Sequence, residues 1–411
     1  MRERALRAIA ECHRIAAMTE EPGRITRRFL TPPMHGVHAL LTGRMKALGM
    51  TVHTDAAGNL RGLWQPANGS KPRLILGSHV DTVPDAGAYD GVLGVTLALE
   101  WVEIAQEIGF PAAIEIVAFS EEEGVRFGVP FIGSRAVAGR FDPALLALKD
   151  AEGVTVDAAI RAFDPDAGLD AGRIGEAVAD GSAIAFVEVH IEQGPVLESE
   201  DLSVAAVTAI VGQTRLSLTF TGHANHAGTT PMQLRRDALA GAAEWISAVE
   251  SIAKNTDGLV ATVGKIDASP NAGNVVPGAA TVSLDARHAS DSARIAAVDA
   301  LLEQANAIAT RRSLALSCKR QMDQPAVPMD ERLTEFLAEA IEASGFVVRR
   351  MPSGAGHDAM VMAARMPTAM LFLRSPGGIS HHPDEAVREE DVEAALHVGR
   401  KFLARLAAEV G

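Results

Sequence analysis

Short apolar runs alternate with amphipathic stretches through the first half of the chain. Residues 73–77, 113–119 and 184–190 are almost continuously apolar, which is typical of strands buried on both faces of a sheet. Apolar positions recur at helical spacing in three other stretches, at residues 5–18, 40–48 and 93–106. Strands that alternate with helices in this way predict a mostly parallel sheet with helices on both sides.

The pattern changes in the second half. In residues 215–222 and 280–288, apolar and polar side chains alternate, which indicates antiparallel strands with one face exposed to water. Beyond them the alternation of helices and strands resumes. We therefore predict an α/β fold with an insert. Residues 1–208 and 327–411 form one discontinuous domain, and residues 209–326 form an inserted α+β domain.

Composition narrows the class of protein. With 411 residues, 47% of them apolar, the chain can bury two sizeable cores. Its net charge of −14 disfavours a nucleic-acid partner. Cys12 and Cys318 form no CxxC pair, so we expect a reducing compartment, the cytoplasm. We expect no signal peptide and no membrane span, because no run approaches roughly 20 apolar residues.

Each apolar run ends in side chains that commonly bind metals. They are His79 and Asp81 after the first run, Glu121, Glu122 and Glu123 after the second, His190 and Glu192 at the third, and His381 and His382 after a later run. In open α/β sheets, ligands bind outside the carboxyl ends of the strands. Imidazoles and carboxylates there, without cysteine, predict a hydrolytic site for divalent metal ions.

Two aspartates near the first run each allow two interpretations. Asp81 can fix the tautomer and orientation of a metal-binding His79, although the His-x-Asp pattern is common without a metal. Asp90 precedes a helical stretch and can be an ordinary N-cap. Its carboxylate could also bridge two cations about 3.5–4 Å apart, as two-metal hydrolases require.

The three consecutive glutamates after the second run repel one another unless cations or water relieve the charge. A solvated acidic turn is one explanation. Their position directly after a buried strand favours a functional one, in which one carboxylate binds a metal ion and another accepts a proton from the attacking water.

Two further motifs also remain open. Of the pair His381 and His382, we expect one to bind a metal and the other to be solvated. The polar loop at residues 221–232 holds histidines that could face either a metal or the substrate. Arg287 lies on the polar face of its strand, where it can bind a carboxylate bidentately or form a salt bridge with Asp285.

The ordered motifs GSHVDTV, YDGVLGV, SEEEGVRF, HIEQGP, GHANHAGTTPM, NVVPG, SGAGHDA and GISHHPDE extend over nearly the whole chain. With them the chain resembles the amidase/hydantoinase/carbamoylase branch of the M20 metallopeptidase family. That branch includes allantoate amidohydrolases, N-carbamoyl-L-amino acid hydrolases and β-ureidopropionases.

The resemblance implies a centre with two divalent metal ions per subunit. One ion would bind His79 and His190, the other would bind Glu123 and His381, and Asp90 would bridge them. The mixed imidazole and carboxylate ligands suit zinc or manganese, with cobalt or nickel as alternatives.

The resemblance also assigns catalytic roles. Glu122, directly before the metal ligand in the EEG core, matches the general base, and Asp81 matches the orienting carboxylate. The Ser-His-x-Pro pattern selects His381 as the metal ligand. His226 would help to stabilise the oxyanion.

Positions that bind the substrate in the family fall mainly in the insert. They are Gln193, Gln213, His226, Asn274, Arg287 and His357. In the family the insert acts as a lid and pairs two subunits. We therefore expect a homodimer in which His226 reaches the partner subunit's active site.

By this resemblance the activity is cleavage of a ureido C–N bond in a small carboxylate. We expect allantoate to give ureidoglycine, ammonia and carbon dioxide. An N-carbamoyl-L-amino acid is the alternative substrate, and a binuclear aminopeptidase or dipeptidase is a more distant alternative. A non-catalytic relative used only for binding is disfavoured, because the base and all the metal ligands are present.

Overall fold

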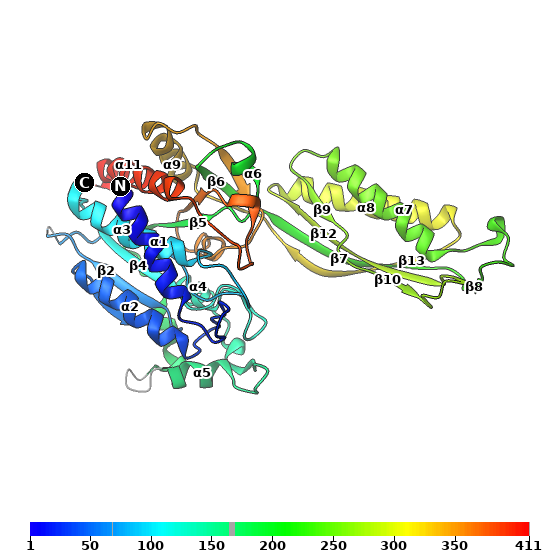
Figure 1. Ribbon diagram of the computed structural model, residues 1–411, viewed down its shortest axis with the longest axis horizontal. Helices are drawn as coiled ribbons and strands as arrows, with labels where there is room; N and C mark the ends of the chain where they lie inside the picture. The colour runs from blue at the N-terminus through cyan, green and yellow to red at the C-terminus, as the bar shows by residue number, and fades with distance from the viewer. Residues whose placement is uncertain (68, 164–168, 411) are drawn as a thin grey trace. The chain divides into compact units, whose positions relative to one another are not determined.

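The chain forms two compact units (Figure 1). The computed structural model describes residues 1–67, 69–163 and 169–410. Unit 1 consists of Met1–Thr208 and Met329–Gly411, and unit 2 consists of Ala209–Pro328. Each unit has its own hydrophobic core, and none of the described residues belongs to both cores.

Unit 1 contains a sheet whose four central strands are parallel. Their order is β4 (Ala113–Phe119), β3 (Arg73–His79), β5 (Ala183–Ile191) and β16 (Thr368–Leu373). Antiparallel strands extend the sheet on both sides: β1 (Thr51–Thr54) and β2 (Leu60–Trp64) lie beyond β4, and β6 (Val204–Ile210) lies beyond β16, with β15 (Arg350–Ser353) also paired to β6. The last two residues of β6 pair with β14 (Val327–Pro328), and these four residues belong to unit 2. The predicted α/β fold with a mostly parallel central sheet is confirmed.

Two of the three strands that lead to the candidate site, β3 and β5, are longer than their apolar runs. Every residue of β4 is buried, and its bounds are those predicted. β3 continues two residues past the predicted end, through Ser78 and His79, and both residues are buried. A polar pair is the usual signal for a strand end. Here the backbone keeps pairing with β4, and the polar side chains enter the site.

A helix that is buried along most of its length follows the first strand of the site. α3 (Val92–Ile108) lies against β3, β4 and β5, while α1 (Arg2–Ala16) and α11 (Glu389–Val410) pack onto it. α2 (Pro33–Ala47) begins seven residues before the predicted stretch, because a proline fits the first turn of a helix. The remaining helices of unit 1 are α4 (Ile132–Val137), α5 (Val156–Phe163), α6 (Val196–Ser199), α9 (Glu331–Ala343) and α10 (Asp358–Met362), with short 3₁₀ turns η1 (Pro143–Ala147), η2 (Ala171–Ala177) and η4 (Pro376–Gly378).

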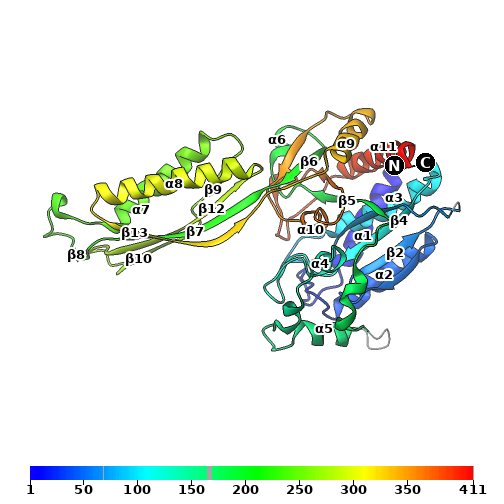
Figure 2. The same cartoon turned by 180° about the vertical axis from the view of Figure 1, so that it is seen from behind.

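Unit 2 is an antiparallel sheet covered on one side by two helices. The strand order is β10 (Ile266–Ser269), β12 (Ala279–His288), β7 (Gly212–Thr221) and β13 (Ala315–Gln324), and β9 (Val260–Thr262) also pairs with β12. Both views show α7 (Ala238–Lys254) and α8 (Asp291–Arg311) along one side of this sheet (Figures 1 and 2). The predicted alternation is present, since every second residue of β7, and of β12 as far as Ala286, is buried.

Unit 2 also contains a separate two-stranded ribbon, which we call the terminal ribbon. It pairs β8 (Asn225–His226) with β11 (Val275–Val276), and the turn η3 (Met232–Leu234) follows β8. In the described part of the chain, no helix is both long enough and apolar enough to cross a membrane.

Candidate metal centre

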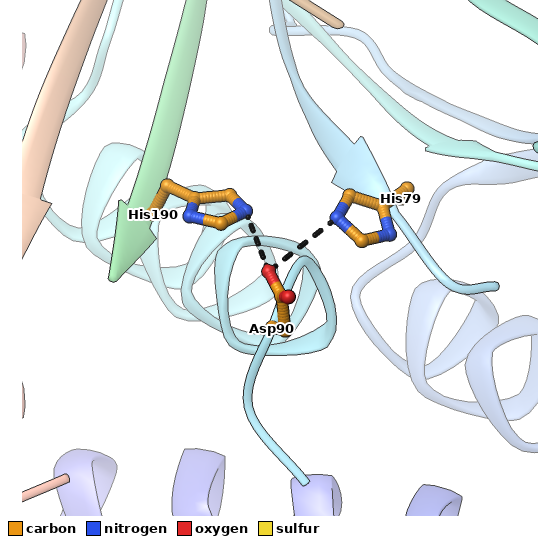
Figure 3. A group of neighbouring side chains, drawn as sticks. All are labelled: His79, Asp90 and His190. Atoms are coloured by element: carbon orange, nitrogen blue, oxygen red, sulfur yellow. Dashed lines mark ion pairs between the residues drawn. The ribbon is translucent and has the colours of Figure 1, made fainter. Parts of the chain in front are cut away.

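Three buried side chains meet where β3 and β5 end (Figure 3). His79 is the last residue of β3, and His190 lies one residue before the end of β5. Because the two strands are parallel neighbours, the two imidazole rings lie side by side, with their centroids 5.7 Å apart. Asp90 comes from the loop before α3. Its Oδ1 lies 3.7 Å from His79 Nε2 and 3.2 Å from His190 Nε2.

The other oxygen of Asp90 faces a different part of the chain. Asp90 Oδ2 lies 3.1 Å from His381 Nε2, and the same nitrogen lies 3.5 Å from Glu123 Oε1. Asp90 is therefore shared between two groups of possible ligands, one with His79 and His190 and one with Glu123 and His381.

Hydrogen bonds decide which ring nitrogens can accept a cation. His79 Nδ1 lies 3.0 Å from the carbonyl oxygen of Asp81, and His190 Nδ1 lies 2.8 Å from that of Ile191. A carbonyl only accepts, so each Nδ1 carries a proton, and each Nε2 faces Asp90, where it can bind a cation when the ring is neutral.

These buried acceptors fit a metal ion. Among the described residues, Asp90 Oδ1 and His190 Nε2 find no hydrogen-bond partner. Two facing lone pairs repel at this separation unless a cation or a proton lies between them. Imidazole nitrogens with carboxylate oxygens are a donor set for zinc, manganese, cobalt or nickel.

The carboxylate of Asp81 binds the backbone of two of the three consecutive glutamates that follow β4. Its two carboxylate oxygens accept the backbone N–H groups of Glu122 and Glu123, at 3.0 and 3.1 Å. Its carbonyl oxygen accepts a hydrogen bond from His79 Nδ1, while its carboxylate Oδ1 lies 3.6 Å from the same nitrogen. One residue thus holds both a ring and a turn of the candidate centre.

The three glutamates point in different directions. Glu121 Oε1 accepts the N–H of Gly124 at 2.6 Å and so closes its own turn. Glu122 lies with His79 and Glu123, whereas Glu123 also faces His381. Burial raises the pKa of Glu122 well above its usual value, and burial together with the charge of Asp90 raises the pKa of Glu123 to about 7.

The histidine pair after β16 also separates. His381 has a left-handed backbone, with φ of 55°, and turns toward Asp90, whereas exposed His382 pairs with Asp384 at 3.6 Å. Gln193 Nε2 donates to Asp90 Oδ2 at 3.0 Å and to Ser380 Oγ at 3.1 Å.

His357 lies behind His190. The ring is buried, its centroid is 4.4 Å from that of His190, and its Nε2 lies 2.8 Å from Ser353 Oγ. Burial lowers the pKa of His357 well below the usual value, so the ring is neutral.

The other predicted substrate residues lie in unit 2, in two separate pairs. His226 and Asn274 meet in the terminal ribbon, where the backbone N–H of Ala227 donates to the carbonyl of Asn274 at 2.9 Å. His226 Nδ1 accepts the N–H groups of Gly228 and Thr229, so its Nε2 carries the ring proton.

Gln213 and Arg287 form the second pair, directly opposite each other on β7 and β12. Both contact Asp285. Gln213 Nε2 donates at 2.6 Å, and Arg287 donates through Nε and Nη2 at 2.9 and 3.0 Å. The salt bridge considered from the sequence is therefore present, with Arg215 as another donor to Asp285 at 3.0 Å.

Three buried acidic residues next to the centre were not predicted from the sequence as part of it. Glu188, on the strand that carries His190, accepts from Ser78 Oγ and from the N–H of Ala359, both at 2.8 Å. Asp358 is buried, and neither of its carboxylate oxygens has a hydrogen-bond partner among the described residues. Glu385 accepts backbone N–H groups beside Asp90. Asp358 and Glu385 belong to two of the ordered motifs, SGAGHDA and GISHHPDE, and an acid inside a buried strand was a usable signal for Glu188.

Glu192 does not join the centre. It accepts the N–H groups of Val196 and Leu197, at 2.7 and 2.8 Å, and so caps α6. Its place after an apolar run resembled that of the ligands, but the chain turns there and directs the carboxylate to the helix.

An α/β domain with imidazoles and carboxylates at the carboxyl ends of its central strands is the architecture of a hydrolytic metalloprotein. Sequence comparison agrees with this class. The chain belongs to the peptidase family M20/M25/M40, whose sequence model matches residues 75–408.

Individual relatives are similar over almost the full length. The chain is 38% identical to an allantoate deiminase of Arabidopsis thaliana, over 94% of this chain and 80% of that protein. It is 38% identical to an N-carbamoyl-L-amino acid amidohydrolase of Geobacillus stearothermophilus, over 92% of each. The crystal structure of a hydantoinase/carbamoylase family amidase from Burkholderia multivorans superposes with a TM-score of 0.90 at 32% identity, covering 98% of this chain and 97% of that one.

Proposed function

We propose that this protein is a metal-dependent amidohydrolase that cleaves the ureido C–N bond of a small carboxylate. Allantoate is the substrate that we place first, with ureidoglycine, ammonia and carbon dioxide as products. The observation that carries the proposal is the shared Asp90. One of its oxygens faces the imidazoles of His79 and His190 at the ends of β3 and β5, and the other faces His381 in the loop before α11. Relatives named for ureido and carbamoyl substrates supply the substrate class.

The ligand set supports two divalent ions in each subunit. His79 and His190 would hold one ion, Glu123 and His381 would hold the other, and Asp90 would bridge them. Bound ions polarise the scissile carbonyl and lower the pKa of a water molecule from 15.7 toward about 7. Zinc and manganese suit this donor set best, and cobalt or nickel could replace them.

Glu122 is placed to move the proton. Its backbone N–H donates to Asp81, and its carboxylate lies beside His79. The carboxylate of Glu121, in contrast, accepts the N–H of Gly124 in its own turn. In this proposal Glu122 takes a proton from the attacking water and passes it to the departing nitrogen. His226 Nε2–H donates to the developing oxyanion.

The distance between the two residue pairs of unit 2 supports a shared active site. Along β7 the Gln213–Arg287 pair is eight residue steps from the pair of Thr221 with Ala279, which is about 27 Å of strand. The His226 ribbon continues beyond that point (Figure 1). One small substrate cannot span this distance, so we propose a homodimer, paired through unit 2 as a lid, in which His226 serves the partner subunit's centre.

An N-carbamoyl-L-amino acid is the second candidate substrate. It offers the same carboxylate and one ureido group, and a relative with that name is 38% identical. The test is an assay of ammonia release by the metal-loaded protein, with allantoate, a panel of N-carbamoyl-L-amino acids and a dipeptide. We expect the highest kcat/KM on allantoate. Amino-acid release from the dipeptide without ammonia from any ureido compound would overturn the proposal.

A further inference from the structure

A buried glutamate joins the loop of Asp90 to the loop of His381. Glu385 is only 6% exposed and lies four residues after His381. Its Oε1 accepts the backbone N–H of Tyr89 at 2.9 Å and that of Asp90 at 3.0 Å. Its Oε2 accepts from Ser380 Oγ at 3.3 Å.

The backbone before α3 has no spare room on either side. A Cβ at Gly87 would lie 2.3 Å from Glu385 Cβ, and a Cβ at Gly91 would lie 2.4 Å from the ring of His79. Residues 87–91 therefore pass between the side chain of Glu385 and the imidazole of His79. Contacts of 2.3–2.4 Å leave no space for a side chain at either glycine, so the path of the backbone at Asp90 is restricted from both sides.

We propose that Glu385 is a positioning residue that sets the relative place of Asp90 and His381 for metal binding. Glu385 contacts only the backbone N–H of Asp90, so both carboxylate oxygens of Asp90 remain directed at the imidazoles. It belongs to the segment that supplies His381, so one side chain fixes two ligands of the second ion. The inference rests on the metal centre proposed above.

The direct test is a titration of the metal-free protein with Co²⁺, followed by calorimetry and visible absorption, without substrate. Glu385→Ala removes the acceptor of both N–H groups and should bind Co²⁺ about 10–100-fold more weakly, as is usual when a residue that orients a metal ligand is lost. Glu385→Gln keeps an oxygen in the position of Oε1. It should bind both ions nearly as wild type does.

Asp150 provides a matched control in unit 1. Asp150 Oδ1 also accepts two backbone N–H groups, those of Glu152 and Val154, at 3.1 and 2.8 Å. Asp150 is 9% exposed, close to the 6% of Glu385. Asp150→Ala should unfold at a lower temperature yet keep the Co²⁺ affinity. Equal losses of affinity in Asp150→Ala and Glu385→Ala would mean that Glu385 acts only on folding.

Wild-type affinity in a folded Glu385→Ala would overturn the inference. If that variant does not fold, Glu385→Asp replaces it, because its shorter side chain cannot reach the same N–H groups. Unchanged Co²⁺ binding by Glu385→Asp would then count against the proposal. A wild-type protein that binds two ions but releases no ammonia would refute the proposed function alone, and one that binds no Co²⁺ would refute both.

Discussion

At the scale of single residues, neighbouring side chains of one type have different partners. Glu121 closes a turn, while Glu122 and Glu123 face the metal-ligand group. His381 faces Asp90, whereas His382 pairs with Asp384 in solvent. Backbone direction makes these differences, so substitutions of adjacent residues can separate the roles.

Glu122→Gln should lower kcat by about 10²–10⁴-fold and leave both metals bound, because an amide cannot accept the proton. The measurements are turnover of the best ureido substrate and metal content per chain. Glu121→Gln is the matched control and should keep most of the activity, since Glu121 contacts the N–H of Gly124. Loss of a metal ion from Glu122→Gln would make Glu122 a ligand and move the base role to a neighbour.

Arg287→Lys should raise KM for the ureido carboxylate more than it lowers kcat. A lysine has one charged nitrogen and cannot reproduce a bidentate fork. Arg215→Lys is the comparison, because Arg215 contacts the same Asp285. If steady-state kinetics of Arg287→Lys match those of wild type, the bond between Arg287 and Asp285 is structural and the substrate carboxylate binds elsewhere.

At the scale of elements, the local pattern predicted strands well and partners poorly. β4 has its predicted bounds, and β7 and β12 alternate as expected, because burial periodicity is a property of a few consecutive residues. The bond between Arg287 and Asp285 could only be offered as one of two alternatives. Such contacts depend on strand register and on loop conformation, which the hydrophobic pattern does not encode.

The two glycines that flank α3 give a prediction at this scale. Gly91 and Gly109 both have positive φ, but a Cβ at Gly91 would meet the ring of His79, whereas none of the described atoms lies within 4 Å of one at Gly109. Gly109→Ala should cost about 1–2 kcal/mol of unfolding free energy and leave metal binding unchanged.

Gly91→Ala should carry a larger backbone cost, because Gly91 has ψ of −50° and lies outside the left-handed helical region that Gly109 occupies. It should also displace His79, so metal affinity should fall. Urea unfolding of the metal-free proteins and metal titration measure the two effects separately. Equal metal affinities in the two variants would show that the His79 ring accommodates the added methyl group.

At the scale of the whole molecule, the proposed dimer predicts complementation between two inactive variants. Glu122→Gln and His226→Ala homodimers are mixed and allowed to exchange subunits. In a mixed dimer, the subunit with intact Glu122 receives His226 from its partner, so one of two sites is complete. Random exchange should restore activity to about a quarter of wild type, as a two-fold dimer requires.

Each variant taken alone through the same exchange is the control for that experiment. Mass spectrometry of differently tagged subunits shows whether mixing has occurred. Mixed dimers without recovered activity would mean that His226 serves its own chain, or that the dimer does not form through unit 2.

The separate cores of the two units have a calorimetric consequence. All five proposed metal ligands lie in unit 1, so ion binding should stabilise only that unit, by RT ln(1 + [M]/Kd). A chelator should lower the melting temperature of one transition and leave the other in place. The temperature interval between the two heat-absorption peaks should therefore change when the metal is removed, and equal shifts of both peaks would mean that the units unfold as one.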